Sequence, residues 1–162
     1  AGWRWAGHRP IVDAVERVLQ VAEHTFATAI NCIDGRAQDP VAEWMRGRFG
    51  VRYVDTITEA GADGILANEL EAVLEPVKSK VMVSTGAHKS RVVAVVGHYG
   101  CAGNPVAPED HLEDIRKGVD VVASWGLPVD VIGLWVNDQW QVEVVCETGR
   151  NASGPKGPSP AD

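Results

Sequence analysis

The sequence lacks an excess of basic residues. Among its 162 residues, 15 Lys and Arg are outnumbered by 22 Asp and Glu, which gives a formal net charge of −7. Nucleic acids and anionic membranes require a basic surface, so neither is expected as a partner. The chain also lacks an apolar run near the roughly 18 residues of a membrane span, and residues 1–10 lack the apolar core of a signal peptide. We therefore expect a cytoplasmic protein that does not bind membranes.

Cysteine is scarce too, and its count of three is odd, which disfavours a closed set of disulfides. A chain of this length with 45% apolar residues buries enough surface to fold as one domain without such crosslinks. Cys32 ends one apolar run, Cys101 follows another, and Cys146 lies inside a third. In a reducing compartment, close groups of cysteine and histidine indicate a metal site or catalysis.

Helical and strand patterns alternate along the chain. Apolar residues at helical spacing predict helices over residues 11–23, 40–48, 65–78 and 108–125. Short β-branched runs predict strands over residues 25–33, 51–57, 91–97, 129–136 and 140–147. Pro76 should end or kink the third helix, and the stretch 81–88 fits either a strand or a loop. The alternation predicts an α/β fold, an open and mostly parallel sheet flanked by helices, with a C-terminal antiparallel hairpin strand.

Three regions are expected along the chain. Residues 1–10 form an N-terminal arm, residues 11–149 form the domain, and residues 150–162, rich in Gly, Pro and Ser, form a flexible tail. Trp3 and Trp5 lie in the arm. They either anchor a dimer interface, where aromatic residues are favoured, or stay disordered or packed on their own subunit.

Two short polar motifs each follow a predicted buried strand: Cys32, Asp34 and Arg36 after the first, His98 and Cys101 after the Val-rich one. In an open parallel sheet, ligands bind beyond the carboxyl ends of the strands. If the two strands are neighbours, Cys32, His98 and Cys101 converge there. Two thiolates and one imidazole suit zinc, and three protein ligands leave the open position of a catalytic site. Asp34 is then either a fourth ligand or a partner of metal-bound water, with Arg36 holding it ionised.

These five residues resemble the two motifs of the β-class carbonic anhydrases, Cys-x-Asp-x-Arg and His-x-x-Cys. The resemblance implies a zinc enzyme that reversibly hydrates carbon dioxide to bicarbonate, with Cys32, His98 and Cys101 as metal ligands. It implies catalytic roles for Asp34 and Arg36, and a closed form in which Asp34 binds the metal. It also implies a homodimer or a higher homo-oligomer.

Other positions depart from the family pattern. Thr58-Glu59-Ala60-Gly61 stands where the family has Arg-Asn-Ala-Gly, and Ala102 replaces the usual Gly after the second zinc cysteine, followed by Gly103-Asn104-Pro105. These departures leave the ligand set intact and put the substrate pocket in doubt. Two alternatives therefore stay open. One is hydrolysis of carbonyl sulfide or carbon disulfide on the same scaffold, and the other is a zinc-binding protein without catalysis.

Some titratable and aromatic residues have less specific predictions. By intrinsic pKa, His24, His88 and His111 are candidates for carrying the proton out of the site, although each is more often a surface or packing residue. Tyr99 either lines the pocket or packs. A solvated acidic face is expected for Glu59, Asp63 and Glu69, and a core position for Cys146.

Overall fold

The computed structural model describes residues 25–148. In this range the elements are β1 (Phe26–Cys32), α2 (Gly35–Phe49), β2 (Tyr53–Glu59), α3 (Ala62–Asn68), α4 (Glu71–Ala87), β3 (Val92–His98), α5 (Pro108–Ser124), β4 (Asp130–Val136) and β5 (Val142–Thr148). The predicted arm, the predicted helix at 11–23 and the predicted tail at 150–162 lie outside the described residues.

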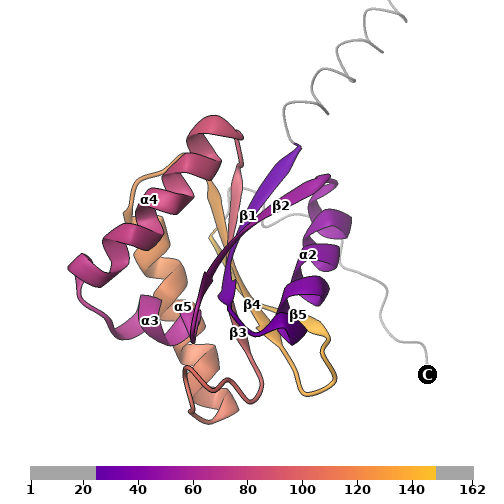
Figure 1. Cartoon of the computed structure of the whole chain (residues 1–162), viewed down its shortest axis with the longest axis vertical. Helices are drawn as coiled ribbons and strands as arrows, with labels where there is room; N and C mark the ends of the chain where they lie inside the picture. Colours follow the sequence, from indigo (N-terminus) through magenta and orange to yellow (C-terminus); the bar gives the residue numbers. More distant parts are fainter. Residues whose placement is uncertain (1–24, 149–162) are drawn as a thin grey trace, which may run out of the picture.

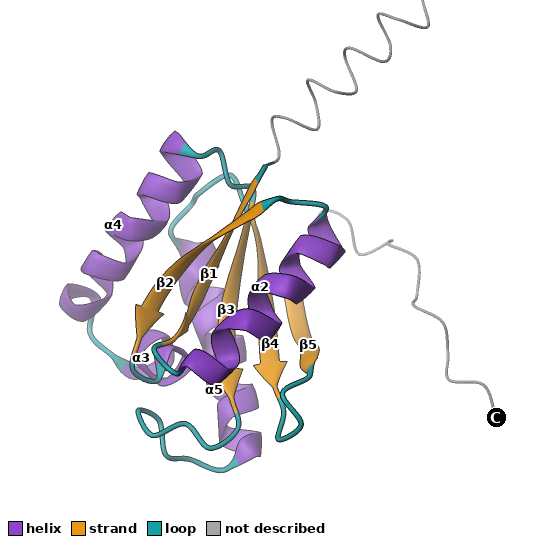
Figure 2. Cartoon of the chain, turned by 45° about the vertical axis from the view of Figure 1, so that its right-hand side comes forward, coloured by secondary structure: helices purple, strands orange, loops and turns teal. Residues whose placement is uncertain are grey.

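One five-stranded sheet organises these elements, in the order β2-β1-β3-β4-β5. The first four strands are mutually parallel and β5 runs antiparallel to β4. Helix α2 covers one face, and α3, α4 and α5 cover the other (Figure 1, Figure 2). The predicted fold class, a mostly parallel α/β sheet with a C-terminal antiparallel strand, is confirmed.

The central strand β3 is buried over its whole length. Its alternate residues face opposite sides: Val92, Ala94 and Val96 join the core cluster under α2, while Val93 and Val95 join the cluster under α3–α5. A strand covered on both faces needs a continuous apolar run rather than an alternating one. This requirement explains the continuous run of valine and alanine in β3.

The helix predicted over residues 108–125 is confirmed as α5 (Pro108–Ser124), whereas two other predicted helices have different bounds. Helix α2 begins at Gly35 rather than Pro40, because the Asp34 side chain caps it by accepting a 3.0 Å hydrogen bond from the Arg36 backbone N–H. The predicted helix at 65–78 is two helices, separated near Leu70, where the backbone is extended.

Pro76 does not end its helix as predicted. Helix α4 runs through it to Ala87 and includes the stretch expected as a strand or loop. Proline removes one helical hydrogen bond, to the carbonyl of Ala72, and both residues are exposed, so water can solvate that carbonyl. The buried positions that hold α4 on the sheet are Leu74, Val77, Val81 and Ser84.

Strand β5 contains a bulge in its pairing with β4. Gly133 pairs with Cys146 and Leu134 with Val144, so Val145 is an extra residue at a bulge. The bulge leaves Val144 exposed. Cys146 is partly buried against the core, in line with its expected packing role.

The loop between β3 and α5, residues 99–107, packs tightly on the start of α3. A Cβ atom on Gly61 would lie 2.5 Å from the Gly103 carbonyl carbon, and one on Gly103 would lie 2.4 Å from the Ala60 carbonyl carbon. Gly61 also has a φ of 72°. Only glycine serves at such a backbone-to-backbone contact with positive φ.

We expect Gly61→Ala to lower the free energy of unfolding by about 2 to 5 kcal/mol, because a left-handed conformation costs about 1 to 2 kcal/mol and overpacking adds about 1 to 3. The control is Gly50→Ala, where φ is 66° and no atom lies within 4 Å of the added Cβ. Gly50→Ala should lower the free energy of unfolding only by the cost of the left-handed conformation, about 1 to 2 kcal/mol. Denaturant unfolding of both variants measures the difference, and equal losses would contradict the packing argument.

Candidate metal centre

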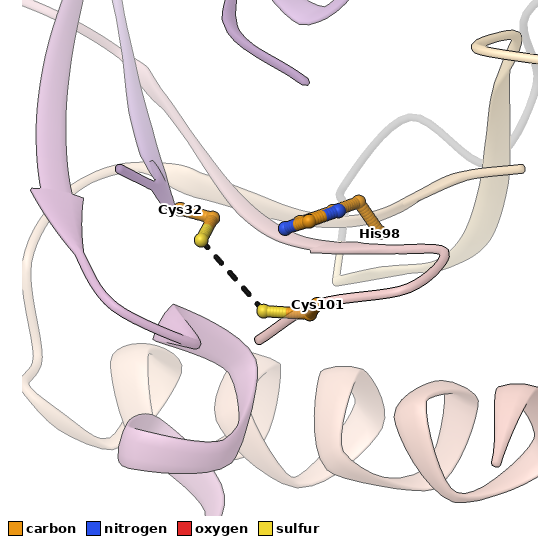
Figure 3. Close-up of side chains that lie close together, drawn as sticks. All are labelled: Cys32, His98 and Cys101. Atoms are coloured by element: carbon orange, nitrogen blue, oxygen red, sulfur yellow. Dashed lines mark hydrogen bonds between the residues drawn. The ribbon is translucent and has the colours of Figure 1, made fainter. Parts of the chain in front are cut away.

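Three potential metal-binding side chains meet at one edge of the sheet (Figure 3). Cys32 is the last residue of β1, His98 is the last residue of β3, and Cys101 follows in the next turn. Because β1 and β3 are parallel neighbours, with Thr28 opposite Val93, both motifs leave the sheet at the same edge. Strands β1 and β3 are therefore neighbours, the condition for convergence, and Cys32, His98 and Cys101 do converge.

The geometry of this group fits a tetrahedral metal. The two Sγ atoms are 3.7 Å apart, and the three ligand atoms lie within 4.8 Å of one another. Two sulfurs bound to tetrahedral zinc at about 2.3 Å would lie about 3.8 Å apart, whereas disulfide sulfurs lie about 2.05 Å apart. Cys32, His98 and Cys101 are all buried, at 4%, 1% and 3% exposure.

The ring of His98 presents a free nitrogen. Nδ1 lies 3.0 Å from the Tyr99 carbonyl oxygen, which accepts only if Nδ1 carries the proton. Nε2 is buried and has no hydrogen-bond partner. A buried unpartnered nitrogen is costly, and a histidine with Nδ1 tied to a carbonyl is the usual arrangement for metal binding through Nε2. The residues present therefore fit a zinc ion.

The Cys101 thiol is hard to ionise without a cation. Burial raises its pKa to about 11, and the neighbouring Cys32 contributes in the same direction. Hydrogen bonds from the backbone N–H groups of Gly103 and Asn104 act the other way. A divalent cation would supply the positive charge that two adjacent thiolates need.

Asp34 and Arg36 lie beside this group as a separate ion pair. The guanidinium donates to both carboxylate oxygens, from Nε at 3.0 Å and from the terminal nitrogen at 2.6 Å. Hydrogen bonding to Arg36 lowers the pKa of Asp34 to about 2. Among the described residues, Asp34 is not part of the group whose ligand atoms approach one another, so the described conformation is not the closed form.

Trp140 is a site residue that sequence reasoning missed. Its ring lies 4.6 Å from the Arg36 guanidinium carbon, a cation–π contact, and its centroid is 6.4 Å from that of His98. Its φ is 60°, a conformation that is unusual for an aromatic residue and is concentrated at functional sites. The sequence placed Trp140 at the start of a regular strand, and no local signal distinguished it.

The remaining candidates have different surroundings, and His88 lies away from the three ligands. His88 is exposed and pairs with Asp55 at 2.7 Å. Its ring stacks on Phe26, at the opposite end of β1 from Cys32. Tyr99 is 49% exposed, and His24 lies outside the described residues.

The expected acidic face was wrong at Asp63. This residue is 1% exposed, and its carboxylate accepts a hydrogen bond from Nδ1 of the equally buried His111 at 2.5 Å. Glu59 instead forms an exposed pair with Lys80. A carboxylate two residues after Gly61 carries no sequence signal for burial, because its partner lies 48 residues away.

Comparison with known proteins identifies the family. The family model described as "Putative carbonic anhydrase" matches residues 22–146, which include both motifs. The chain belongs to this carbonic anhydrase family. The resemblance to β-class carbonic anhydrases is thus confirmed at the level of the family.

Solved carbonic anhydrases share the fold. The structure of tetrameric β-carbonic anhydrases from Sordaria macrospora aligns with a TM-score of 0.51 and 13% identity, over 90% of this chain and 93% of that chain. For β-carbonic anhydrase isoform I from Trichomonas vaginalis the TM-score is 0.49 and the identity 14%, over 86% and 97% of the two chains.

A curated relative bears a different name. Purine nucleoside phosphorylase ORF3 of Streptomyces griseus is 31% identical over 135 residues, which are 81% of this chain and 48% of that protein. The chain thus spans about half the length of the curated relative that it matches. The activity in that name belongs to the longer protein.

The ion pair beside the centre gives a titration test. Arg36→Ala should raise the pKa of Asp34 from about 2 towards its usual value near 3.9, because the bidentate donor is lost. Since the folded-state pKa is depressed, the pair stabilises the protein above about pH 4 and loses that effect as the pH falls towards 2. NMR titration of the carboxyl carbon measures the shift. Arg48→Ala, which removes an exposed guanidinium paired with Glu147, should leave Asp34 unchanged, and an equal response in both variants would contradict the assignment.

Proposed function

We propose that this protein binds one zinc ion through Cys32, His98 and Cys101 and catalyses the reversible hydration of carbon dioxide to bicarbonate. The observation that carries the proposal is the buried group of two thiols and one unpartnered imidazole nitrogen within 4.8 Å. Its composition is that of a catalytic zinc site with three protein ligands. Membership of a carbonic anhydrase family supports the substrate.

Zinc, when bound, supplies acidity: it lowers the pKa of water from about 16 to about 7, so that a hydroxide nucleophile is available at neutral pH. The protein supplies orientation. Asp34 is ionised throughout the physiological range because Arg36 depresses its pKa, so it acts as a hydrogen-bond acceptor for the nucleophile. Trp140, stacked on the guanidinium, restrains Arg36 and with it the carboxylate.

The open coordination position favours catalysis over a purely structural metal. In the described part of the chain, the group that could hold a metal comprises three ligands, whereas structural zinc sites close with four. The described conformation keeps the Asp34 carboxylate on Arg36, so in this conformation Asp34 would not serve as a fourth ligand of a zinc ion held by the three residues.

The described histidines do not provide an evident proton carrier. His88 lies at the opposite end of β1 from Cys32, where it stacks on Phe26, and His111 is buried against Asp63. We therefore propose that solvent or buffer accepts the proton.

Two cysteine variants test the proposal. Cys32→Ser should reduce bound zinc from about one per chain to near zero and abolish carbon dioxide hydration, because one of three ligands is lost. Cys146→Ser is the matched control, since Cys146 lies outside the ligand group. This variant should keep both its bound zinc and its hydration activity. Metal analysis and stopped-flow hydration across pH 6 to 9, a range that brackets a pKa of about 7, measure the two properties.

Zinc-loaded protein without hydration above background would contradict the enzyme proposal. Sulfide release from carbonyl sulfide or carbon disulfide, with weak carbon dioxide activity, would transfer the proposal to the hydrolase alternative. A fourth protein ligand at every pH would identify the non-catalytic one.

The assembly and location are also proposals. The similar Sordaria macrospora enzymes are tetrameric, and we propose a homodimer or a higher homo-oligomer for this chain, which sedimentation analysis would measure. No helix in the described range is both long and apolar enough to span a membrane, and a cytoplasmic location stays a prediction from the sequence.

A further inference from the structure

The loop that carries Cys101 is fastened by one side chain, that of Asn104. This side chain is 8% exposed, and its Nδ2 donates a 3.1 Å hydrogen bond to the Asp114 carboxylate on α5. It also lies directly on the backbone of α3, because a Cβ atom on Gly64 would be 2.7 Å from the Asn104 Cγ. Asn104 therefore connects the loop to two helices that come from different parts of the chain.

A buried Asp–His pair forms the wall beside Asn104. The Nδ1 atom of His111 lies 2.5 Å from the Asp63 carboxylate and 3.5 Å from the Asn104 Nδ2. Because the Nδ1–H of His111 donates to the Asp63 carboxylate, this nitrogen cannot accept a hydrogen bond from the Asn104 amide. The Asn104 amide donates to Asp114 instead. Gly97, next to the ligand His98, leaves room for Asp63: a Cβ atom there would be 2.6 Å from its Oδ2. Polar side chains from α3, α5 and the loop therefore form a buried layer next to the metal centre.

The loop connects this layer to the sulfur of Cys101. Gly103 is pressed against the backbone of Ala60 and Gly61. The backbone N–H groups of Gly103 and Asn104 face the Cys101 thiol and lower its pKa against the effect of burial. Donors aimed at a sulfur stabilise its thiolate form and fix its direction.

We propose that Asn104 is a positioning residue of the metal centre: its side chain, bound to Asp114 and seated on α3, holds the amides of residues 103 and 104 against the Cys101 sulfur, so that this sulfur points towards Cys32 and His98. The inference rests on the proposed zinc site. It gives a role to the Gly103-Asn104-Pro105 segment, which follows the position where this chain departs from the family pattern.

The structure offers a matched control for the lost hydrogen bond. Asn68 on α3 donates to the other oxygen of the same Asp114 carboxylate, at 3.3 Å, but it lies outside the loop. Asn68→Ala and Asn104→Ala therefore remove the same kind of bond to the same acceptor. Only the second should change the metal centre.

Zinc affinity in competition with a chromophoric chelator is the first measurement. We expect Asn104→Ala to weaken zinc binding about 10- to 100-fold, the usual effect of losing an outer-shell partner, and Asn68→Ala to change it less than about twofold. The cobalt-substituted Asn104→Ala protein should show weaker thiolate-to-metal charge-transfer absorption, a signature that a general loss of stability does not produce. Equal affinities and spectra in the two variants would overturn the proposal.

Amide hydrogen exchange in the metal-free protein is the second measurement, and it does not depend on zinc. Asn104→Ala should accelerate exchange at residues 103 and 104 at least tenfold, while Asn68→Ala should not. If Asn104→Ala does not fold, the isosteric Asp114→Asn, which weakens the same bond by removing its charge, should shift affinity and exchange in the same direction. Unchanged exchange would overturn the positioning role. If the exchange rates change as predicted but the unmodified protein binds no zinc, only the proposed function is overturned.

Discussion

The parallel pairing of β1 with β3 is the constraint on which the site depends. It places the ends of two strands, 66 positions apart between Cys32 and His98 in the printed numbering, at one edge of the sheet. The register is secured because β3 is buried on both faces, and a slip by one residue would exchange the faces of all its side chains. Two sulfurs and a ring nitrogen consequently meet without any local sequence link between the first motif and the second.

The polar groups around this point divide into two sets with different chemistry. On the side of α2, the Asp34–Arg36 pair and the stacked Trp140 form a partly exposed arrangement. Next to the loop that carries Cys101, four buried polar residues form hydrogen bonds with one another: Asp63 with His111, and Asn104 with Asp114. Hydrogen bonds between buried polar groups rigidify their surroundings, although the buried Nε2 of His111 has no hydrogen-bond partner among the described residues. The candidate metal centre therefore lies between a buried set of polar side chains and a partly exposed ion pair.

Sequence reasoning predicted the strands well and the helix boundaries less well. The Val-rich run at β3 and the two motifs carry their own signals, because burial on both faces and metal-type side chains are visible in composition. The start of α2 was missed because Asp34 was interpreted only as a site residue, although it is also a helix cap. Asp63, Trp140 and Asn104 could not be found, because their roles arise from contacts with residues distant in sequence.

X-ray absorption at the zinc edge would count the sulfur, nitrogen and oxygen atoms bound to the metal. We predict two sulfurs at about 2.3 Å and two nitrogen or oxygen neighbours at about 2.0 to 2.1 Å. The third cysteine, Cys146, should contribute no sulfur. A shell without sulfur, or one with four protein ligands and no place for water, would contradict the proposed three-ligand zinc site.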